Sequence, residues 1–332
     1  MKRRDFLKVA AGVAAAAANG TAMMAWSSRA LAATVERTFY ITEGFITQIT
    51  GEDTYHQAYS GSSGSLDVPG ESFIVQEGDL VRVTIVNTLG TPHSFVIDGL
   101  VDSGSIAPYQ SRTVEFVADR VGSFLYYDKL NAPYNRLAGL HGGMAVMPQG
   151  RSDQVYPSSP TFVQQQFWVF NDFDPAWNDA VRLGQTPSSA YEARYFTLNG
   201  LGGRPPGAPG AHDPNLDALT DPRSALHGHI GDRTLVRMLN AGLADQSVHT
   251  HANHMEWLTE NGSIRPDVWL KDCIYLEGRM GSVDAIYPFE VPPDSWPPVS
   301  IGAYPMHLHT EMSQTAGGGY YMFGAMTDIY FE

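Results

Sequence analysis

Short runs of alternating apolar residues, each closed by turn residues, constrain the fold of this chain more than any other feature. Their period-two spacing is that of β-strands, and helical periodicity is scarce between them. The chain has 33 glycines and 21 prolines, which together with Asn and Asp separate the runs. We therefore predict an all-β fold, built as sandwiches of antiparallel sheets rather than as a barrel. The clearest runs are Phe73–Val75, Leu80–Val86, Thr113–Val117 and Met144–Met147.

Two stretches of the chain repeat one another, as a duplicated domain would. Residues 77–87 and residues 230–240 both place a Gly-Asp turn before a strand that ends in Asn, and histidines follow soon after each. The length remaining beyond an N-terminal leader suits two domains of ordinary size. The predicted division is a first domain at 33–150, a polar linker at 151–162 and a second domain at 163–332, with a Gly- and Pro-rich surface excursion at 200–222.

Residues 1–32 have the pattern of an export signal. Lys2-Arg3-Arg4 opens a basic region, an alanine-rich apolar stretch follows, and Ala30-Leu31-Ala32 supplies small residues for cleavage. Paired arginines followed by Phe-Leu-Lys match the twin-arginine signal. We predict a cleaved leader, a periplasmic or extracellular mature protein, and no stable membrane span after cleavage. An uncleaved N-terminal anchor is the alternative.

Charge and cysteine content narrow the function classes. The leader holds five of the 21 basic and one of the 35 acidic residues, so the mature chain carries 16 against 34, a net charge of −18. Such a surface repels nucleic acid and attracts cations. The single cysteine, Cys273, excludes an intrachain disulfide and a Cys-rich zinc or iron–sulfur site. Because it lies in a strand-like run, Cys273 is predicted to be a small buried core residue.

Five histidines in two short blocks carry the strongest functional signal. His249, His251 and His254 form the first block, and His307 and His309 form the second. A His-x-His pair on a strand puts both imidazoles on one face. Two such strands side by side would surround one point with four imidazoles, the usual ligands of copper and zinc. The sequence therefore predicts a metal site, and two unrelated surface pairs are the alternative.

At these residues the chain resembles the multicopper oxidase family and its copper nitrite reductase relatives. The resemblance spans both halves, and its most specific parts are residues 239–243 before the first block and the run Met306-His307-Leu308-His309. It implies two cupredoxin-like Greek-key β-sandwich domains and copper as the cofactor. In the family, a type 1 copper takes up electrons, and four His-x-His pairs hold a trinuclear cluster between domains that reduces oxygen. The two pairs of this chain fall where one domain's contribution belongs.

The second domain departs from the family pattern at the type 1 copper. The cysteine that family members carry in the last His-x-His motif is replaced by Leu308, and its partner histidines are replaced by Gln246 and Ser313. Thiolate defines a blue copper site, and leucine has no donor atom. The resemblance therefore implies no type 1 copper in the second domain.

The first domain departs further. Its two His-x-His pairs are replaced by Val96 with Asp98 and by Tyr127 with Lys129. His93 matches a type 1 histidine, but Asp128 stands at the cysteine position, so His93 is predicted to be a satisfied buried histidine. Neither a complete trinuclear cluster nor a complete type 1 centre can be assembled, and the chain is not an ordinary laccase.

The surviving histidines define the predicted site. We predict one copper, or two, bound in the second domain, with zinc as a competitor. Partners that would fix the imidazole tautomers are predicted from sequence proximity as Glu256, Asp98 and Glu311. Two-domain relatives often form trimers, and a homotrimer would bring Asp98 of one chain to the histidines of the next. The predicted metal ligands are His249, His251, His307 and His309, with His254 or Asp98 completing the shell.

Two functional classes stay open. In the first, the chain is a copper-dependent oxidoreductase without type 1 copper, and its small-molecule or metal-ion substrate or an external electron-transfer protein supplies electrons. In the second, it is a non-catalytic periplasmic copper-binding or scaffold protein of the same fold. Intact ligand pairs favour the first class and the missing relay favours the second. The sequence assigns no catalytic residue.

Overall fold

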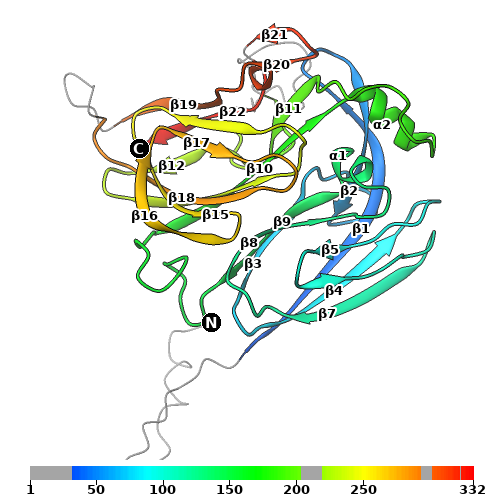
Figure 1. Cartoon of the computed structure of the whole chain (residues 1–332), viewed down its shortest axis with the longest axis horizontal. Coiled ribbons are helices and arrows are strands. Elements are labelled where there is room, and N and C mark those ends of the chain that lie inside the picture. Colours follow the sequence, from blue (N-terminus) through cyan, green and yellow to red (C-terminus); the bar gives the residue numbers. More distant parts are fainter. Residues whose placement is uncertain (1–31, 203–218, 293–300, 322) are drawn as a thin grey trace, which may run out of the picture. The chain divides into compact units, whose positions relative to one another are not determined.

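The computed structural model describes residues 32–202, 219–292, 301–321 and 323–332, and strands are the main regular structure within them (Figure 1). The described helices are short, and none is long and apolar enough to cross a membrane. The all-β prediction is therefore confirmed. Almost all of the predicted leader and most of the predicted excursion at 200–222 lie outside the described residues. The helical elements are α1 (Tyr134–Leu137), α2 (Pro175–Arg182) and the 3₁₀ helix η1 (Glu311–Gln314).

Two sheets form the first half of the chain and enclose an apolar core. Phe39, Phe95 and Tyr126 stack at its centre, with ring centroids 5.2–6.1 Å apart. Sheet I has the strand order β2 (Asp53–Ser60), β1 (Thr34–Thr47), β4 (Leu80–Asn87), β7 (Ser111–Val117). Sheet II has the order β3 (Gly70–Gln76), β9 (His141–Met147), β8 (Gly122–Tyr127), β5 (Val96–Ile97), β6 (Val101–Asp102).

Two further sheets form the second half around a core that includes Trp168, Met238 and Leu308. Sheet III has the order β16 (Ser263–Lys271), β15 (Met255–Glu260), β18 (Ser282–Pro288), β13 (Arg233–Asn240), β10 (Gln164–Phe173), β11 (Tyr195–Leu198), β20 (Thr315–Ala316), β21 (Tyr320–Tyr321). Sheet IV has the order β12 (Leu226–Gly228), β22 (Met326–Phe331), β19 (Gly302–Leu308), β14 (Gln246–Thr250), β17 (Cys273–Leu276).

The sheets are mixed, which corrects the prediction of purely antiparallel sheets. Each of the four contains one parallel pair: β1 with β4, β3 with β9, β10 with β13, and β12 with β22. Alternation of apolar and polar residues shows that one face of a strand is buried. It does not show the direction of the neighbouring strand, so the parallel pairs left no signal in the sequence.

The repeated stretches occupy equivalent places in the two halves. Strand β4 lies between parallel β1 and antiparallel β7, and β13 lies between parallel β10 and antiparallel β18. Asn87 and Asn240, which end these strands, make the same turn. Each side-chain oxygen accepts the amide two residues on at 3.0 Å, and each side-chain amide donates to the carbonyl four residues on, at 2.8 and 2.9 Å.

A buried polar network joins the two halves. Arg237 donates from Nη1 to Ser123 Oγ at 2.8 Å and to Asp284 Oδ1 at 3.2 Å, and Thr259 donates to the other carboxylate oxygen of Asp284 at 2.9 Å. A buried guanidinium requires such partners, since an unpaired buried charge is costly. Residues 32–332 form one compact unit. The domain boundaries therefore remain a prediction.

Candidate metal centre

Strands β14 and β19 lie side by side and bring the two histidine blocks together. They pair antiparallel with His249 directly opposite His307. Val248 and Leu308 alternate with these histidines and are buried in the core, at 0% and 1% exposure. Because successive side chains point to opposite faces of a strand, the histidines lie on the outer face of sheet IV. The His-x-His spacing predicts this arrangement, but the pairing of the two strands comes from the fold.

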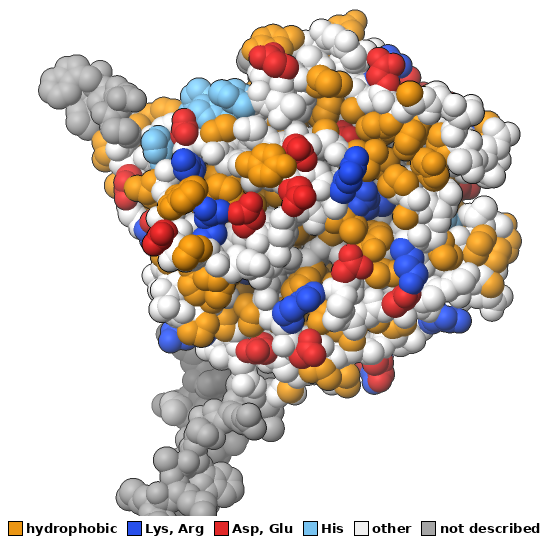
Figure 2. Space-filling model, viewed as in Figure 1, with side chains coloured by type: hydrophobic (Ala, Val, Ile, Leu, Met, Phe, Trp, Pro, Cys, Tyr) orange, Lys and Arg blue, Asp and Glu red, His pale blue; other side chains and the backbone are white. Residues whose placement is uncertain are grey.

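The same ladder carries the remaining two histidines. The amide of His251 donates to Pro305 O at 3.1 Å, and that of His309 donates to Ser247 O at 2.8 Å. All four imidazoles therefore follow one face of two neighbouring strands. Figure 2 shows a patch of histidine side chains on the surface at the upper left of the molecule. We call His249, His251, His307 and His309 the histidine face.

The rings of the histidine face lie at distances that suit a shared ion. The His249 ring centroid lies 4.4–5.2 Å from the other three. One nitrogen each of His249, His307 and His309 lies within 4.8 Å of the others. His251 is outside this three-histidine group, but its Nε2 is 3.2 Å from Nε2 of His307. Two nitrogens bound to one tetrahedral ion at about 2.0–2.1 Å would lie roughly 3.3 Å apart. These residues therefore fit a metal ion.

Hydrogen bonds orient two of the imidazoles. Nδ1 of His249 lies 3.0 Å from the carbonyl of Asp272 and 3.8 Å from its carboxylate, and Nδ1 of His307 lies 3.3 Å from Leu308 O. An Nδ1–H that donates to a carbonyl leaves the Nε2 lone pair free for a metal. Sequence reasoning missed Asp272, because only the pairing of β14 with β17 brings the preceding turn to His249.

The environment favours the neutral form of three of these rings. Burial lowers the pKa of His249, His251 and His307, and the neighbouring imidazoles of the histidine face lower it further. Burial and like charge both disfavour the imidazolium form. Since only a neutral imidazole has a lone pair to give, the arrangement favours metal binding.

Two predicted ligands lie outside this group in the described part of one chain. His254 is exposed and precedes β15, and the three-histidine group does not include it. Asp98 lies in the first half, where its carboxylate accepts a hydrogen bond from the Tyr127 hydroxyl at 3.0 Å. Both remain predicted ligands, and Asp98 would have to come from another copy of the chain.

The carboxylates predicted from sequence proximity lie elsewhere. Glu256 pairs with Arg233, with 2.5 Å between Oε2 and Nη2. Glu311 is exposed at the start of η1, and the described contacts do not connect it to a histidine. Proximity in sequence was a poor guide, because the neighbours of an imidazole are set by adjacent strands.

In the first half, a hydrogen-bonded carboxylate occupies the position where the resemblance places a type 1 copper. Asp128 and His93 are both buried, and Oδ2 of Asp128 lies 2.7 Å from Nδ1 of His93 and 2.8 Å from Nδ2 of Asn135. Oδ1 accepts from the amide and hydroxyl of Ser94 and from the amide of Leu130, at 2.6–2.9 Å. The carboxylate thus has five donors in a buried site, and His93 is a satisfied buried histidine, as predicted.

The corresponding position of the second half has no metal-binding set either. Leu308, Gln246 and Ser313 are all buried, at 0–1% exposure. The Ser313 hydroxyl donates to Thr310 O at 2.6 Å. An apolar side chain, a neutral amide and a hydroxyl do not form a blue copper site.

Cys273 is not a core residue, so that prediction is wrong. It stands opposite His249 on β17 and therefore shares the outer face of sheet IV with the histidines. Its side chain is half-buried, and Sγ lies 2.8 Å from Ser247 Oγ. The alternation of β17 is right but its phase is reversed, because Ile274 and Leu276 fill the core.

Two further histidines are buried in the first half without a metal-like environment. Nδ1 of His56 lies 3.1 Å from Ala138 O, and Nδ1 of His141 lies 2.8 Å from Arg136 O. Burial lowers the pKa of each to about 4. They are neutral packing residues.

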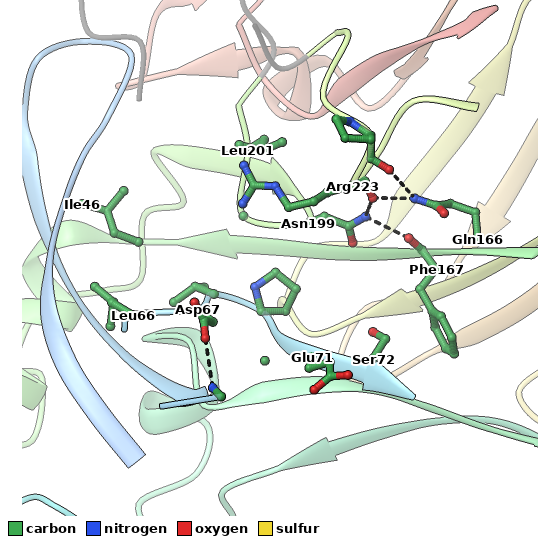
Figure 3. A pocket seen from close by; sticks show the side chains of 16 residues that line it. Ile46, Leu66, Asp67, Glu71, Ser72, Gln166, Phe167, Asn199, Leu201 and Arg223 are labelled. Atoms are coloured by element: carbon green, nitrogen blue, oxygen red, sulfur yellow. Dashed lines mark hydrogen bonds between the residues drawn. The ribbon is translucent and has the colours of Figure 1, made fainter. Parts of the chain in front are cut away.

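A cavity of about 760 Å³ lies apart from the histidine face (Figure 3). Both halves line it, including Glu71 from β3 and Phe167 from β10. Several of its polar groups are already engaged: Arg223 pairs with Asp221 at 2.7 Å, and Asn199 donates to Phe167 O at 2.8 Å. Its described lining holds no histidine, so this cavity is not the predicted metal site.

Known proteins share both the sequence pattern and the fold. Residues 48–151 match a family model described as multicopper oxidase. The copper-containing nitrite reductase of Alcaligenes xylosoxydans xylosoxydans is 25% identical over 244 residues, which cover 68% of this chain and 70% of that protein.

Two solved structures are similar throughout the chain. The blue copper oxidase of Nitrosomonas europaea has a TM-score of 0.70 at 19% identity and covers 89% of this chain and 85% of its own. The copper nitrite reductase of Nitrosomonas europaea has a TM-score of 0.63 at 19% identity, with coverages of 90% and 94%. This likeness shows the fold.

The paired β-sandwich sheets and these neighbours define a protein of the cupredoxin type. Together these findings support a cupredoxin-type family related to multicopper oxidases and copper nitrite reductases. The names of these relatives also imply copper as the cofactor, in agreement with the copper predicted from the sequence.

Proposed function

We propose that this chain is an exported copper protein whose second half holds the metal through histidine side chains alone. The observation that carries the proposal is the pairing of His249 with His307, which sets four imidazoles on one face at ligand distances. The lowered pKa values of His249, His251 and His307 support it. Imidazole suits copper and zinc alike, and the copper-named relatives favour copper.

We propose further that the protein is a copper-dependent oxidoreductase without type 1 copper. Bound copper would supply one-electron redox chemistry. His309 is exposed, so a small-molecule or metal-ion substrate can reach the histidine face directly. Leu308 and the Asp128 network provide no thiolate relay. Electrons would therefore come from the substrate or from an external electron-transfer protein.

A second candidate is a non-catalytic copper-binding or scaffold protein. The observation that favours it is the hydrogen-bond network around Asp128, which occupies the position where family members hold the type 1 copper that takes up electrons. Loading the mature protein with copper and measuring turnover of phenols and of reducing metal ions distinguishes the two. Turnover that is lost in His309→Ala supports the oxidoreductase, and stoichiometric copper binding without turnover supports the carrier.

The histidine centre itself is tested by electron paramagnetic resonance of the Cu(II)-loaded protein. We expect a type 2 signal with nitrogen couplings and no intense blue absorption band, and His249→Ala and His309→Ala should each remove most of that signal. His227→Ala is a matched control, because His227 is exposed on β12 of the same sheet and pairs with Glu332. Unchanged copper binding in both ligand variants would overturn the proposal.

We also propose a homotrimer in which the first half of one copy covers the histidine face of the next. Asp98 could then complete the metal shell, since it lies outside the histidine group of its own chain. Light scattering of the mature protein tests this assembly. A monomer at all concentrations, with copper bound, would rule it out.

A further inference from the structure

Two sulfur side chains stand in register with the histidine face. Met326 on β22 lies opposite His307, and Cys273 on β17 lies opposite His249. His307 and His249 in turn face each other. One straight row, Met326–His307–His249–Cys273, therefore crosses four neighbouring strands of sheet IV. The burial patterns of β22 and β17 put both sulfur residues on the outer side, where each is half-buried.

The backbone hydrogen-bond pattern brings the side chains of His249 and Cys273, and those of His307 and Met326, close together. Backbone hydrogen bonds join residue 251 to residue 305 and residue 309 to residue 247. The odd-numbered residues of β14 and β19 therefore direct their backbone N–H and C=O groups toward each other, and not toward β17 or β22. His249 therefore makes no ladder bond to Cys273, and His307 makes none to Met326. In antiparallel sheets such non-hydrogen-bonded pairs have the shorter separation, with Cα atoms about 4.5 Å apart.

The surroundings provide a small hollow beside Met326 and a weakly bonded thiol at Cys273. His307 and Met326 line the same small hollow, about 10 Å³ in volume, together with Gln314. That volume matches roughly one water-sized probe. On the other flank, Cys273 is a free cysteine whose Sγ contacts the Ser247 hydroxyl at 2.8 Å, and a thiol–hydroxyl bond is weak.

Thioether and thiolate ligands select Cu(I), whereas imidazole also serves Cu(II). We propose that the flanks of the row, Cys273 with His249 and Met326 with His307, each bind Cu(I). The inference rests on the proposed function and deepens it, because it gives the histidine face a separate mode of binding for the reduced metal. In this proposal the four imidazoles bind Cu(II), and each Cu(I) is bound by one sulfur and the imidazole opposite it.

X-ray absorption of the mature protein loaded with copper under ascorbate tests this inference. We expect nitrogen scatterers together with a sulfur shell at about 2.3 Å, the usual metal–thiolate distance. Cys273→Ser and Met326→Leu should each weaken the sulfur shell, and the double variant should abolish it and lower Cu(I) affinity at least tenfold. Met280→Leu is the matched control, because this half-buried methionine packs against Leu125 and Val169 instead. The control should keep the sulfur shell.

A measurement on the unsubstituted protein guards against folding defects in the variants. One equivalent of Ag⁺, a redox-inert substitute for Cu(I), should protect Cys273 from alkylation by iodoacetamide. Alkylation at the same rate with and without Ag⁺, or a Cu(I) spectrum with nitrogen scatterers only, would overturn the inference.

The Cu(II) resonance signal separates this inference from the proposed function. Cys273→Ser and Met326→Leu should leave that signal unchanged. A normal Cu(II) signal without a sulfur shell refutes the sulfur flanks alone. A sulfur shell in a protein that gives no Cu(II) signal refutes the histidine centre alone.

Discussion

Asp128→Asn should destabilise the first half of the protein, because this substitution keeps the shape of the side chain and reverses the polarity of one of its atoms. Oδ1 would keep its three donors from Ser94 and Leu130. The new amide nitrogen would face Nδ1 of His93 and Nδ2 of Asn135, which now donate at 2.7 and 2.8 Å. Two donors would then meet a donor in a site where Asp128 has 0% exposure.

The geometry sets the expected size of the effect. A hydrogen bond to a charged group contributes about 1.5–3 kcal/mol, so losing two would cost roughly 3–6 kcal/mol. His93 can recover one of them by moving its proton to Nε2 and accepting at Nδ1. We therefore expect a loss of roughly 1.5–3 kcal/mol in the free energy of unfolding, the contribution of the one bond that is not recovered, which lowers the melting temperature by a few degrees.

Urea unfolding of the mature chain, followed by circular dichroism, measures this loss. Asp102→Asn is the matched control, because this carboxylate is exposed and pairs with Lys129 at the surface. Removing such a surface pair should cost less than about 1 kcal/mol. If Asp128→Asn and the control unfold at the same urea concentration, the network around Asp128 does not stabilise the fold and the reasoning fails.

Three other outcomes are expected. The free energy of unfolding should fall as the pH drops from about 6.5 to 4, because burial lowers the pKa of His56 and His141 to about 4 and the unfolded chain therefore binds more protons in this range. Urea unfolding at several pH values should show a weaker pH dependence of stability in the His56→Gln/His141→Gln variant, and an equal pH dependence would contradict the assignment. Leu308→Cys restores the family's His-Cys-His motif, yet the copper-loaded variant should show no blue absorption band, because Gln246 and Ser313 stand where the family has the two type 1 histidines. A strong band would show that one residue is enough to rebuild the type 1 site. Replacing Arg3 and Arg4 by lysine should retain the protein in the cytoplasm, which cell fractionation measures, and normal export would point to another route.

The candidate site shows where sequence reasoning succeeded and where it stopped. The spacing of His249 and His251, and of His307 and His309, predicts the shared face, because side-chain direction follows from the strand period. For Cys273 the alternation was recognised but the buried face was assigned to the wrong residues, because a period of two residues does not say which face of the strand is buried. Asp272 and Met326 gave no signal, because both reach the histidine face through strand pairing between distant segments.

The sequence by itself determined the class of the protein: an all-β chain, duplicated, with paired histidines intact in one half and the thiolate ligand missing from both. These properties are local, since they depend on residue type and on spacing within single strands. Tertiary structure alone decided that His249 faces His307, that Cys273 and Met326 flank them, and that hydrogen bonds to Asp128 fill the position where the resemblance places a type 1 copper. Such contacts join segments far apart in the chain, and the energy that selects them comes from burying both faces of the sandwich together.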